Sequence, residues 1–431
     1  MRVLVLGGYG LIGGEIMRAL AGAGYEVVGL GRNAALGQRL FPRAHWIGAD
    51  LSRLTTPDLW TAHLEGVDAI VNAAGALQAG PRDNLVAVQE KAIKACIAAA
   101  ELGGVRAFIQ ISAVGVKRNA STLFLRTKAE ADGALRASKL NWTILRPGLV
   151  IARNAYGGTA LLRMLAAFPF VTPLILSNAP VQTVAAEDVA QAVVMALDGR
   201  APSRAVYDLV EDEPHSLADV VSMFREQLGF GKARARIALP ASLGAMVARW
   251  ADIAGWLGWR PSLRSTALTV MREGVTGDPA KWKEATGASL KPLDQTLADI
   301  PSTAQERVYA RAQLILPPAL LALAFFWIAS GLIGLIQHER AALYLTALVG
   351  KKFAGLLVNA GAALDIAIGA GLLIRPVARA AAAFSVLAAF GYLIAGSFIA
   401  PGLWLDPLGV YVKVIPAILL GGVVALLLEE R

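Results

Sequence analysis

The chain contains little cysteine, little histidine and little charge for its length. Of its 431 residues, one is cysteine (Cys96) and four are histidine. A single cysteine excludes a disulfide framework and fits a reducing compartment such as the cytosol. The four histidines stand in no metal-ligand spacing, which argues against a zinc site. Charged residues make up 17% of the chain and hydrophobic residues 56%, a balance that is unusual for a soluble protein.

The basic residues do not indicate a nucleic-acid partner. The formal net charge is +9, but the lysines and arginines form no stripe interleaved with aromatic residues, so we expect no nucleic acid to bind. Hydrophobic residues concentrate after about residue 312, in runs long enough to span a membrane. We therefore expect a lipid bilayer as a partner, with anionic headgroups near the surface lysines and arginines.

The first residues predict a nucleotide-binding loop between a strand and a helix. The apolar run 3–6 indicates a buried parallel strand, and three glycines follow it in the spacing G-x-x-G-x-x-G. The first glycine would allow a tight turn, the second close approach of a pyrophosphate to backbone N–H groups, and the third close packing of the helix. The residues that we expect to hold the pyrophosphate are Gly7, Gly10, Leu11, Ile12 and Gly13.

The end of the second predicted strand indicates which dinucleotide would bind. Strand 25–30 is followed by Gly31 and Arg32, where NAD-binding proteins usually place an acidic residue on the ribose 2′-hydroxyl. Arg32 offers a planar cation to a 2′-phosphate instead. We therefore expect NADP(H) to be preferred and NAD(H) to be possible. A solvated surface arginine is the alternative interpretation.

Four further apolar runs, 45–49, 69–72, 108–111 and 142–148, predict more strands that alternate with helices. Such alternation indicates an α/β Rossmann-like, doubly wound parallel sheet whose ligand lies at the carboxyl ends of the strands. Ser112 follows one of these strands, and Lys128 lies on a helix that starts near Thr122. The residues after two other strands, which we expect beside the cofactor, are Asp50, Leu51, Ala73, Ala74 and Gly75.

Together these motifs resemble the short-chain dehydrogenase/reductase superfamily in its extended or atypical branch. They look most like the NmrA-like members and the nucleotide-binding accessory subunit of respiratory complex I. The resemblance covers about residues 1–300, and it implies that Lys128 binds the nicotinamide ribose and that Ser112 polarises a substrate oxygen. The matching residues are Gly7, Gly10, Gly13, Asp50-Leu51, Asn72-Ala73-Ala74-Gly75, Ser112, Lys128 and Leu145-Arg146-Pro147-Gly148.

The chain departs from this family at the usual proton donor. In catalytically active relatives a tyrosine precedes the lysine by four residues, and here that position is Phe124. A phenyl ring has no proton to give. In the first interpretation, Ser112, Tyr156 or a water takes the place of the tyrosine, and the protein is an oxidoreductase that reduces a small lipophilic carbonyl, enone or quinone-related substrate. In the second interpretation, the domain is non-catalytic. The second case predicts an NAD(P)H-binding sensor or an assembly factor for a membrane complex. An epimerase or dehydratase with tightly held NAD is a third possibility, which Gly31-Arg32 disfavours.

The rest of the first 300 residues predicts a substrate lid, formed by about 148–180 and 205–300. Apolar side chains within 161–170 suit an apolar substrate, and they equally suit a core against the next domain. The segment 241–259 predicts an amphipathic helix with Trp250 and Trp256 among its apolar residues. Such a helix either rests at a bilayer interface or packs on the soluble domain.

After a linker at 301–313, the region 314–431 predicts an all-α, four-helix transmembrane bundle. Its four apolar runs are 314–336, 353–374, 380–400 and 408–428, each of spanning length. The region resembles the small, four-helix DoxX-like membrane family, most visibly at Phe326-Trp327-Ile328-Ala329-Ser330-Gly331-Leu332. Four spans place both ends of the chain on one side, and NADPH is in the cytosol. We therefore expect a multi-pass protein of the cytoplasmic (inner) membrane with its N-terminal domain and C-terminus cytosolic.

One acidic residue, Asp365, lies near the middle of the second predicted span. A carboxylate at that depth is costly unless it is neutral, paired or beside water. It is either functional, in contact with a quinone or a proton, or a protonated and hydrogen-bonded structural residue.

Overall fold

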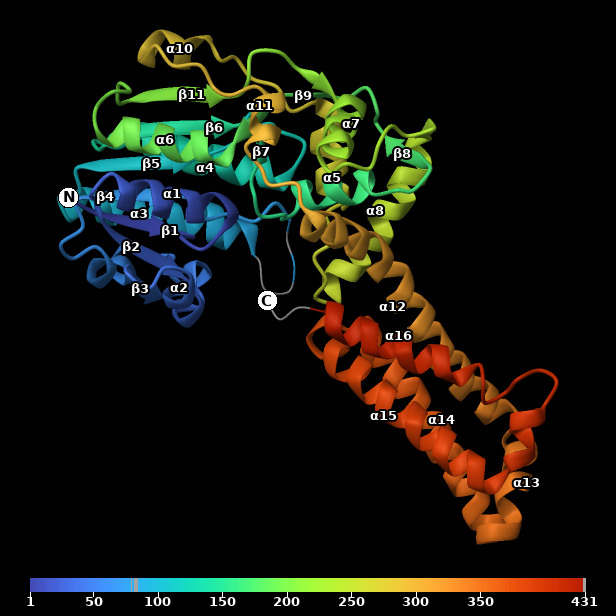
Figure 1. The fold of residues 1–431 in the computed structure, drawn as a ribbon. Helices are drawn as coiled ribbons and strands as arrows, with labels where there is room; N and C mark the ends of the chain where they lie inside the picture. The colour runs from blue at the N-terminus through green and yellow to red at the C-terminus, as the bar shows by residue number, and fades with distance from the viewer. Residues whose placement is uncertain (79, 81–83, 429–431) are drawn as a thin grey trace. The chain divides into compact units, whose positions relative to one another are not determined.

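The computed structural model describes residues 1–78, 80 and 84–428. The chain divides into two compact units (Figure 1). The first comprises Met1–Asp252 and Pro261–Ala310, and the second comprises Ile253–Arg260 and Arg311–Arg431. The last three residues of the predicted membrane domain, 429–431, lie outside the described residues.

The first unit is built on a seven-stranded sheet in the order β11-β6-β5-β4-β1-β2-β3. Each neighbouring pair is parallel, which confirms the predicted doubly wound arrangement. The inner strands read as continuous apolar runs because helices cover both of their faces. The strands are β1 (Arg2–Leu6), β2 (Glu26–Gly31), β3 (His45–Gly48), β4 (Ala69–Asn72), β5 (Ala107–Ile111), β6 (Asn141–Pro147) and β11 (Ala205–Leu209).

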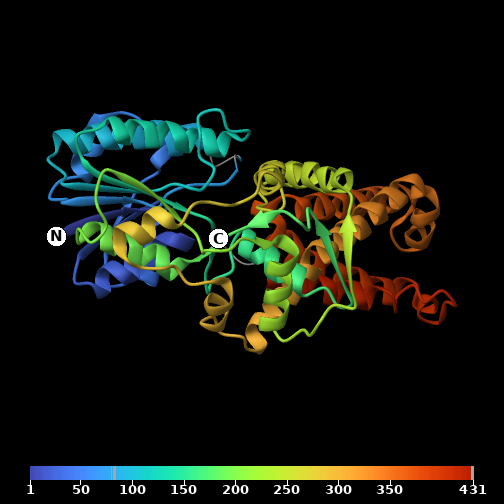
Figure 2. The same cartoon turned by 90° about the horizontal axis from the view of Figure 1, so that it is seen from above.

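Two layers of helices enclose this sheet, as Figure 2 shows. On one face α1 (Leu11–Gly22) and α6 (Ala186–Leu197) share a hydrophobic core with the strands, and on the other face α3 (Ala92–Leu102) and α4 (Leu123–Ala137) share a second one. Shorter helices connect the strands on the β3 side: α2 (Ala34–Leu40), η1 (Leu51–Arg53) and η2 (Pro57–His63). The carboxyl ends of the parallel strands therefore meet at one edge, where ligands of such sheets bind.

The chain after β6 adds a third core to the first unit, formed by small elements around Leu162, Phe224 and Leu293. These elements fall mainly in the segments expected as the substrate lid. Apart from α6 and β11, the elements between β6 and α12 are β7 (Leu149–Ile151), α5 (Gly158–Ala166), β8 (Val171–Ile175), β9 (Pro180–Val181), β10 (Thr183–Ala185), β12 (His215–Ser216), α7 (Leu217–Gln227), β13 (Ala235–Leu239), α8 (Ala241–Trp256), α9 (Ser265–Glu273), α10 (Ala280–Thr286) and α11 (Leu293–Ala298).

The second unit is helical, and among the described residues three helices are long and apolar enough to cross a membrane: α12 (Ala304–Ile336), α14 (Lys351–Leu373) and α15 (Arg375–Ile399). Helix α12 begins at Ala304, inside the segment expected as a linker. Two elements of the second unit are shorter and lie outside the predicted spans: α13 (His338–Val349) and η4 (Pro401–Leu405).

The fourth predicted span is shorter than expected. The run 408–428 forms α16 (Val414–Leu427), whose 14 residues extend about 21 Å at 1.5 Å per residue, against a hydrocarbon thickness of about 30 Å. The cause is a turn before the helix. Gly409 has a φ of 64° and its N–H donates to the carbonyl of Asp406 at 2.8 Å, so helical geometry starts only at Val414.

Candidate functional site

The glycine loop forms a close turn that only glycines can occupy. Gly7 has a φ of 75°, and a Cβ on it would lie 2.9 Å from the Cα of Ala74. A Cβ on Gly13 would overlap the carbonyl oxygen of Gly7. Helix α1 starts at Leu11, and Gly10 precedes it without any side-chain cap. The first N–H groups of the helix therefore have no side-chain cap from Gly10, and N–H groups at such a position are suited to binding a pyrophosphate.

The loop after β4 lies against this turn. The N–H of Ala73 donates to the carbonyl of Leu6 at 3.0 Å, and the N–H of Ala74 donates to Oδ1 of Asn72 at 3.1 Å. A Cβ on Gly75 would lie 3.7 Å from Nζ of Lys128. The structure thus brings together the glycine loop, Ala73–Gly75 and Lys128.

The end of β2, where we expect the adenosine ribose, is partly covered by an aromatic ring. The ring of Tyr9 packs on Gly31, and its hydroxyl accepts the N–H of Asn33 at 3.1 Å. Arg32 lies between them with an exposed side chain. Asp50 uses Oδ1 to accept the N–H and the hydroxyl of Ser52, at 3.0 and 2.8 Å. The side chain of Leu51 is buried in the core, so only its backbone could face a cofactor.

Helix α4 places three chemically important side chains on one face. Phe124, Lys128 and Asp132 follow each other at four-residue spacing, so they lie one turn apart. The Lys128 ammonium donates to the carbonyl of Ile111 at 2.8 Å and lies 5.7 Å from the centre of the Phe124 ring. Lys128 is 7% exposed. The lysine therefore keeps a fixed position at the end of β5, although the usual tyrosine is absent.

Behind Ser112 lies a carboxyl group that the sequence analysis missed. The Ser112 hydroxyl donates to Oδ2 of Asp132 at 2.7 Å, and Asp132 is 0% exposed. Nη2 of Arg146 lies 3.6 Å from the same oxygen. Among the described residues, Oδ1 of Asp132 has no hydrogen-bond partner. The four-residue spacing from Lys128 was the available signal, but the partner Ser112 lies 20 residues earlier in the chain.

Burial moves the pKa values of the two ionisable groups on α4 toward neutrality. It lowers the pKa of Lys128 to about 8, and the nearby charge of Asp132 opposes this shift only in part. Burial also raises the pKa of Asp132 above its ordinary value, against the opposing effects of Ser112, Lys128 and Arg146. Asp132 therefore holds a proton more readily than an exposed carboxyl group does, and Lys128 releases one more readily than an exposed lysine.

A second missed residue, Gln89, connects the β4 loop to α4. It lies in η3 (Val86–Lys91), a short π-helical stretch at the start of the helix that continues as α3. Its amide donates to the carbonyl of Ala76 and accepts the Thr127 hydroxyl at 3.2 Å. π-Helical turns occur often at functional sites because they redirect one side chain. Gln89 therefore positions the loop beside Lys128.

Tyr156, the other predicted substitute for the missing tyrosine, lies in the lid just before α5. Its side chain is largely exposed, and its backbone N–H donates to Oγ1 of Thr159 at 3.0 Å. The Ser112 hydroxyl donates to Asp132.

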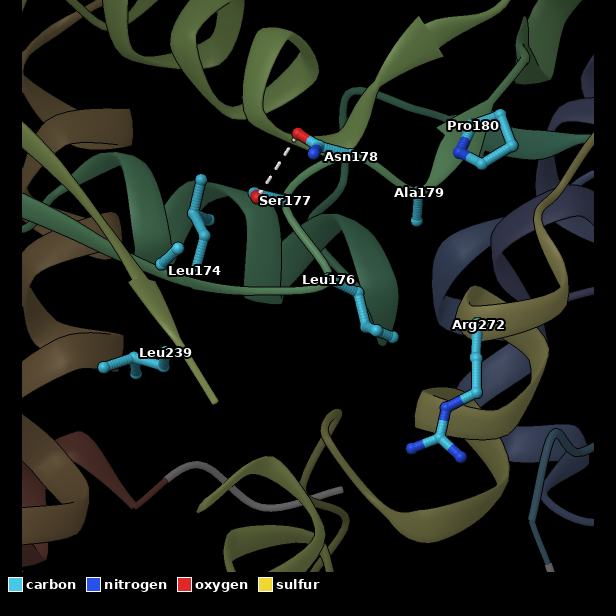
Figure 3. Close-up of a pocket in the computed structure, with 9 residues that line it drawn as sticks. Leu174, Leu176, Ser177, Asn178, Ala179, Pro180, Leu239 and Arg272 are labelled. Atoms are coloured by element: carbon cyan, nitrogen blue, oxygen red, sulfur yellow. Dashed lines mark hydrogen bonds between the residues drawn. The ribbon is translucent and has the colours of Figure 1, made fainter. Parts of the chain in front are cut away.

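The lid segments enclose a pocket of about 360 Å³, shown in Figure 3. Leu174 and Leu239 lie on one side of it, with Arg272 facing them from α9. Leu176 adopts a φ of 57°, an uncommon conformation for a branched residue that costs about 1–2 kcal/mol. The lining combines apolar side chains with the polar Ser177 and Asn178 and the cation of Arg272, and it does not include Ser112 or Lys128.

In the second unit, Asp365 joins three helices through hydrogen bonds. The hydroxyl of Ser330 on α12 donates to Oδ2 at 2.8 Å, and the hydroxyl of Tyr392 on α15 donates to Oδ1 at 3.0 Å. Asp365 itself, on α14, is 6% exposed. Of the two predicted roles, this arrangement favours the structural one.

Comparison with known proteins supports both halves of this description. Residues 7–200 match a family described as NAD(P)H-binding, and residues 324–421 match the DoxX-like family. An NAD(P)H azoreductase from Xenophilus azovorans is 26% identical over 227 residues, which are 53% of this chain and 74% of that protein.

Solved structures resemble the first unit. The enzyme WbmH of Bordetella bronchiseptica, in complex with NAD+, is 18% identical with a TM-score of 0.52, over 69% of this chain and 96% of that one. The UDP-glucuronic acid 4-epimerase of Bacillus cereus, in complex with NAD and UDP-glucuronic acid, is 18% identical with a TM-score of 0.52, over 72% of this chain and 99% of that one. At such identities the likeness shows the fold.

The fold and the matched family description therefore indicate an NAD(P)H-binding Rossmann domain. The same chain continues into a DoxX-like, membrane-associated helical region. The predicted combination of the two is confirmed.

Proposed function

We propose that the protein is a membrane-anchored NAD(P)H-dependent oxidoreductase that reduces a lipid-soluble carbonyl, enone or quinone-related compound. The observation that carries this proposal is the hydrogen bond between Ser112 and the buried Asp132, which supplies an alternative to the missing tyrosine. The curated relative is named an NAD(P)H azoreductase, which supports reduction of an organic acceptor as the class of reaction.

The first unit would hold the cofactor through its backbone and one lysine. The glycine loop and the start of α1 bind the pyrophosphate, Ala73–Gly75 line the strand ends, and Lys128 donates to ribose hydroxyls. When bound there, the cofactor would supply hydride chemistry toward the acceptor carbon. The protein then has to provide one proton to the acceptor oxygen.

Ser112 and Asp132 provide that proton in two linked transfers. Ser112 gives its hydroxyl proton to the oxygen as negative charge develops there. Burial raises the pKa of Asp132, and in its protonated form Asp132 would reverse the hydrogen bond, give its own proton to Ser112 Oγ and become a carboxylate. Arg146 and Lys128 stabilise that carboxylate. The net result is one hydride and one proton added to the acceptor, with the proton on Asp132 replaced from solvent after product release.

Arg32 supports a preference for NADP(H) over NAD(H). Its guanidinium follows β2 where the adenosine ribose would lie, and a 2′-phosphate would bind it in a charge-assisted manner worth about 1.5–3 kcal/mol. Calorimetric titration with both cofactors should therefore give tighter binding of NADPH. Arg32→Glu should reverse the order, and an unchanged ratio of the two affinities would remove this part of the proposal.

Turnover can be tested on full-length protein purified in mild detergent. With NADPH, a panel of apolar ketones, enones, quinones and an azo dye should contain an acceptor that oxidises the cofactor. Asp132→Asn should slow that turnover about 10²–10⁴-fold, because the amide has no proton to give. Glu130→Gln is a matched control on the same helix, since Glu130 is half-exposed and pairs with Lys94. No oxidation with any acceptor would reject the proposal.

Phe124 favours a second candidate, a non-catalytic NAD(P)H sensor or an assembly factor for a membrane complex. This alternative predicts tight cofactor binding, no oxidation and a protein partner that co-purifies from membranes. Phe124→Tyr places a phenol beside Lys128. If that variant alone turned over, the native chain would be the binding protein.

We also propose a location in the cytoplasmic membrane, with the first unit and the C-terminus in the cytosol. The supply of NADPH in the cytosol and the predicted even number of crossings support this orientation. Because α16 is short, the side on which the C-terminus lies depends on whether this helix crosses the membrane. Reporter fusions at both ends should indicate the same side, and opposite sides would mean that α16 does not cross.

A further inference from the structure

Helix α8 turns its large apolar side chains outward and its small residues inward. Gly244, Ala248 and Gly255 are buried, and a Cβ on Gly244 would lie 2.7 Å from Cγ2 of Ile175. Helices on water-exposed surfaces show the reverse pattern. The outward residues of the part that belongs to the second unit, which we call the α8 apolar face, are Ile253, Trp256 and Leu257, and they are all exposed.

The C-terminal end of α8 is attached to the turn between α14 and α15. The indole N–H of Trp259 donates to the carbonyl of Leu373 at 2.7 Å, and the N–H of Arg375 donates to the carbonyl of Leu257 at 2.9 Å. The Arg375 guanidinium lies 5.5 Å from the centre of the Trp259 ring. Gly258, with a φ of 89°, allows the backbone to approach Pro376.

This attachment determines the level at which α8 ends. Both α14 and α15 are long and apolar enough to cross a membrane. A turn that connects two consecutive spans has to lie at a bilayer surface. The residues bonded to that turn, Leu257 and Trp259, therefore lie at the surface as well.

The composition of the segment matches that environment. Tryptophan is enriched at membrane interfaces, where its ring is in contact with acyl chains and its N–H with water or headgroups. Trp256 is 68% exposed. The basic residues of the same helix and turn are Arg249, Arg260, Arg375 and Arg379, and cations at this depth favour anionic headgroups.

We propose that the α8 apolar face lies in the headgroup region of an anionic lipid bilayer, next to the α14–α15 turn. The proposal is independent of catalysis and of cofactor binding. A protein partner would also cover an apolar face, but only the bilayer is already present where the α14–α15 turn lies.

Single-cysteine labelling of full-length protein in vesicles tests this directly. Cys96 is buried, so it can be replaced by alanine to give a background without reactive thiols. Ile253→Cys and Trp256→Cys report the α8 apolar face, and Leu102→Cys, at a position that is 86% exposed in the first unit, is the matched control. Each variant carries a polarity-sensitive fluorophore in vesicles of phosphatidylglycerol and phosphatidylethanolamine.

At positions 253 and 256 we expect several-fold weaker quenching by aqueous iodide than at position 102. We also expect strong quenching there by a lipid that carries a spin label close to its headgroup. Retained NADPH binding by each variant verifies folding. Iodide quenching equal to that at position 102 would overturn the proposal. Protection from both quenchers, in vesicles and in detergent alike, would also overturn it, because it would show a protein cover such as a second copy of the chain.

Discussion

Two buried aspartates, one in each unit, have opposite surroundings. Asp132 accepts a hydrogen bond from Ser112 and lies 3.6 Å from Arg146, with Lys128 one turn away. Asp365 accepts hydrogen bonds from two hydroxyl groups, those of Ser330 and Tyr392. Among the residues that the structure describes, none forms an ion pair with Asp365.

The difference indicates which of the two can change its charge. Cations beside Asp132 stabilise its ionised form, while burial stabilises its neutral form, so both states are accessible. Asp365 has only neutral partners in an apolar bundle, where an isolated charge is expensive. Asp132 is therefore equipped for proton transfer, and Asp365 for holding helices together.

Replacement of each aspartate by leucine should give the largest difference between the two sites, measured as the loss in free energy of unfolding. Asp132→Leu leaves the partly buried Arg146 and the buried Lys128 without the carboxylate that Asp132 provides when ionised, which should lower the free energy of unfolding by up to about 3–5 kcal/mol. Asp365→Leu removes hydrogen bonds only. Denaturation of both variants in the same detergent measures the difference, and equal losses would contradict the comparison.

Lys128→Met tests the cation in the first site. Loss of charge-assisted hydrogen bonds worth about 1.5–3 kcal/mol should weaken NADPH binding about 10–100-fold. In the native protein, affinity should fall as the pH rises through about 8, because the lysine then loses its proton. Calorimetry at a series of pH values in the native protein and in Lys128→Met provides the test. A pH dependence that persists in the methionine variant would assign it to another group.

The same shift has the opposite sign for stability without cofactor. The pKa of Lys128 is lower in the folded protein than its ordinary value of 10.5, so folding favours the neutral amine. Stability should therefore increase as the pH rises from about 8 toward 10.5, and Lys128→Met should lose this gain. Thermal unfolding across that pH range checks it, with Lys94→Met as the control at a half-exposed lysine.

The smallest effect is expected for Asp365→Asn. The amide oxygen accepts one of the two hydroxyl groups and the serine or tyrosine can accept from the amide nitrogen, so stability should change by less than about 1 kcal/mol, whereas Asp365→Leu should cost about 1–2 kcal/mol. NADPH turnover should be unchanged in the asparagine variant. A large loss of turnover there would give Asp365 the functional role that its hydrogen bonds do not indicate.

The sequence allowed the sheet and the glycine loop to be predicted because both depend on local signals. Apolar runs of strand length and glycines at three-residue spacing need no knowledge of distant residues. Asp132 was missed because its partner Ser112 belongs to another element, so only the folded sheet end shows the pair. The length of α16 was missed because hydropathy does not detect a turn, and Gly409 interrupts the run without lowering its apolar character.

The most direct test of the central claim is the rate of NADPH oxidation in single turnover by native protein, Asp132→Asn and the double variant Asp132→Asn with Phe124→Tyr. If Asp132 is the proton donor behind Ser112, Asp132→Asn should be slow, and the double variant with a tyrosine beside Lys128 should recover much of the rate. Native rates in Asp132→Asn alone would contradict it, because the proton would then come from elsewhere.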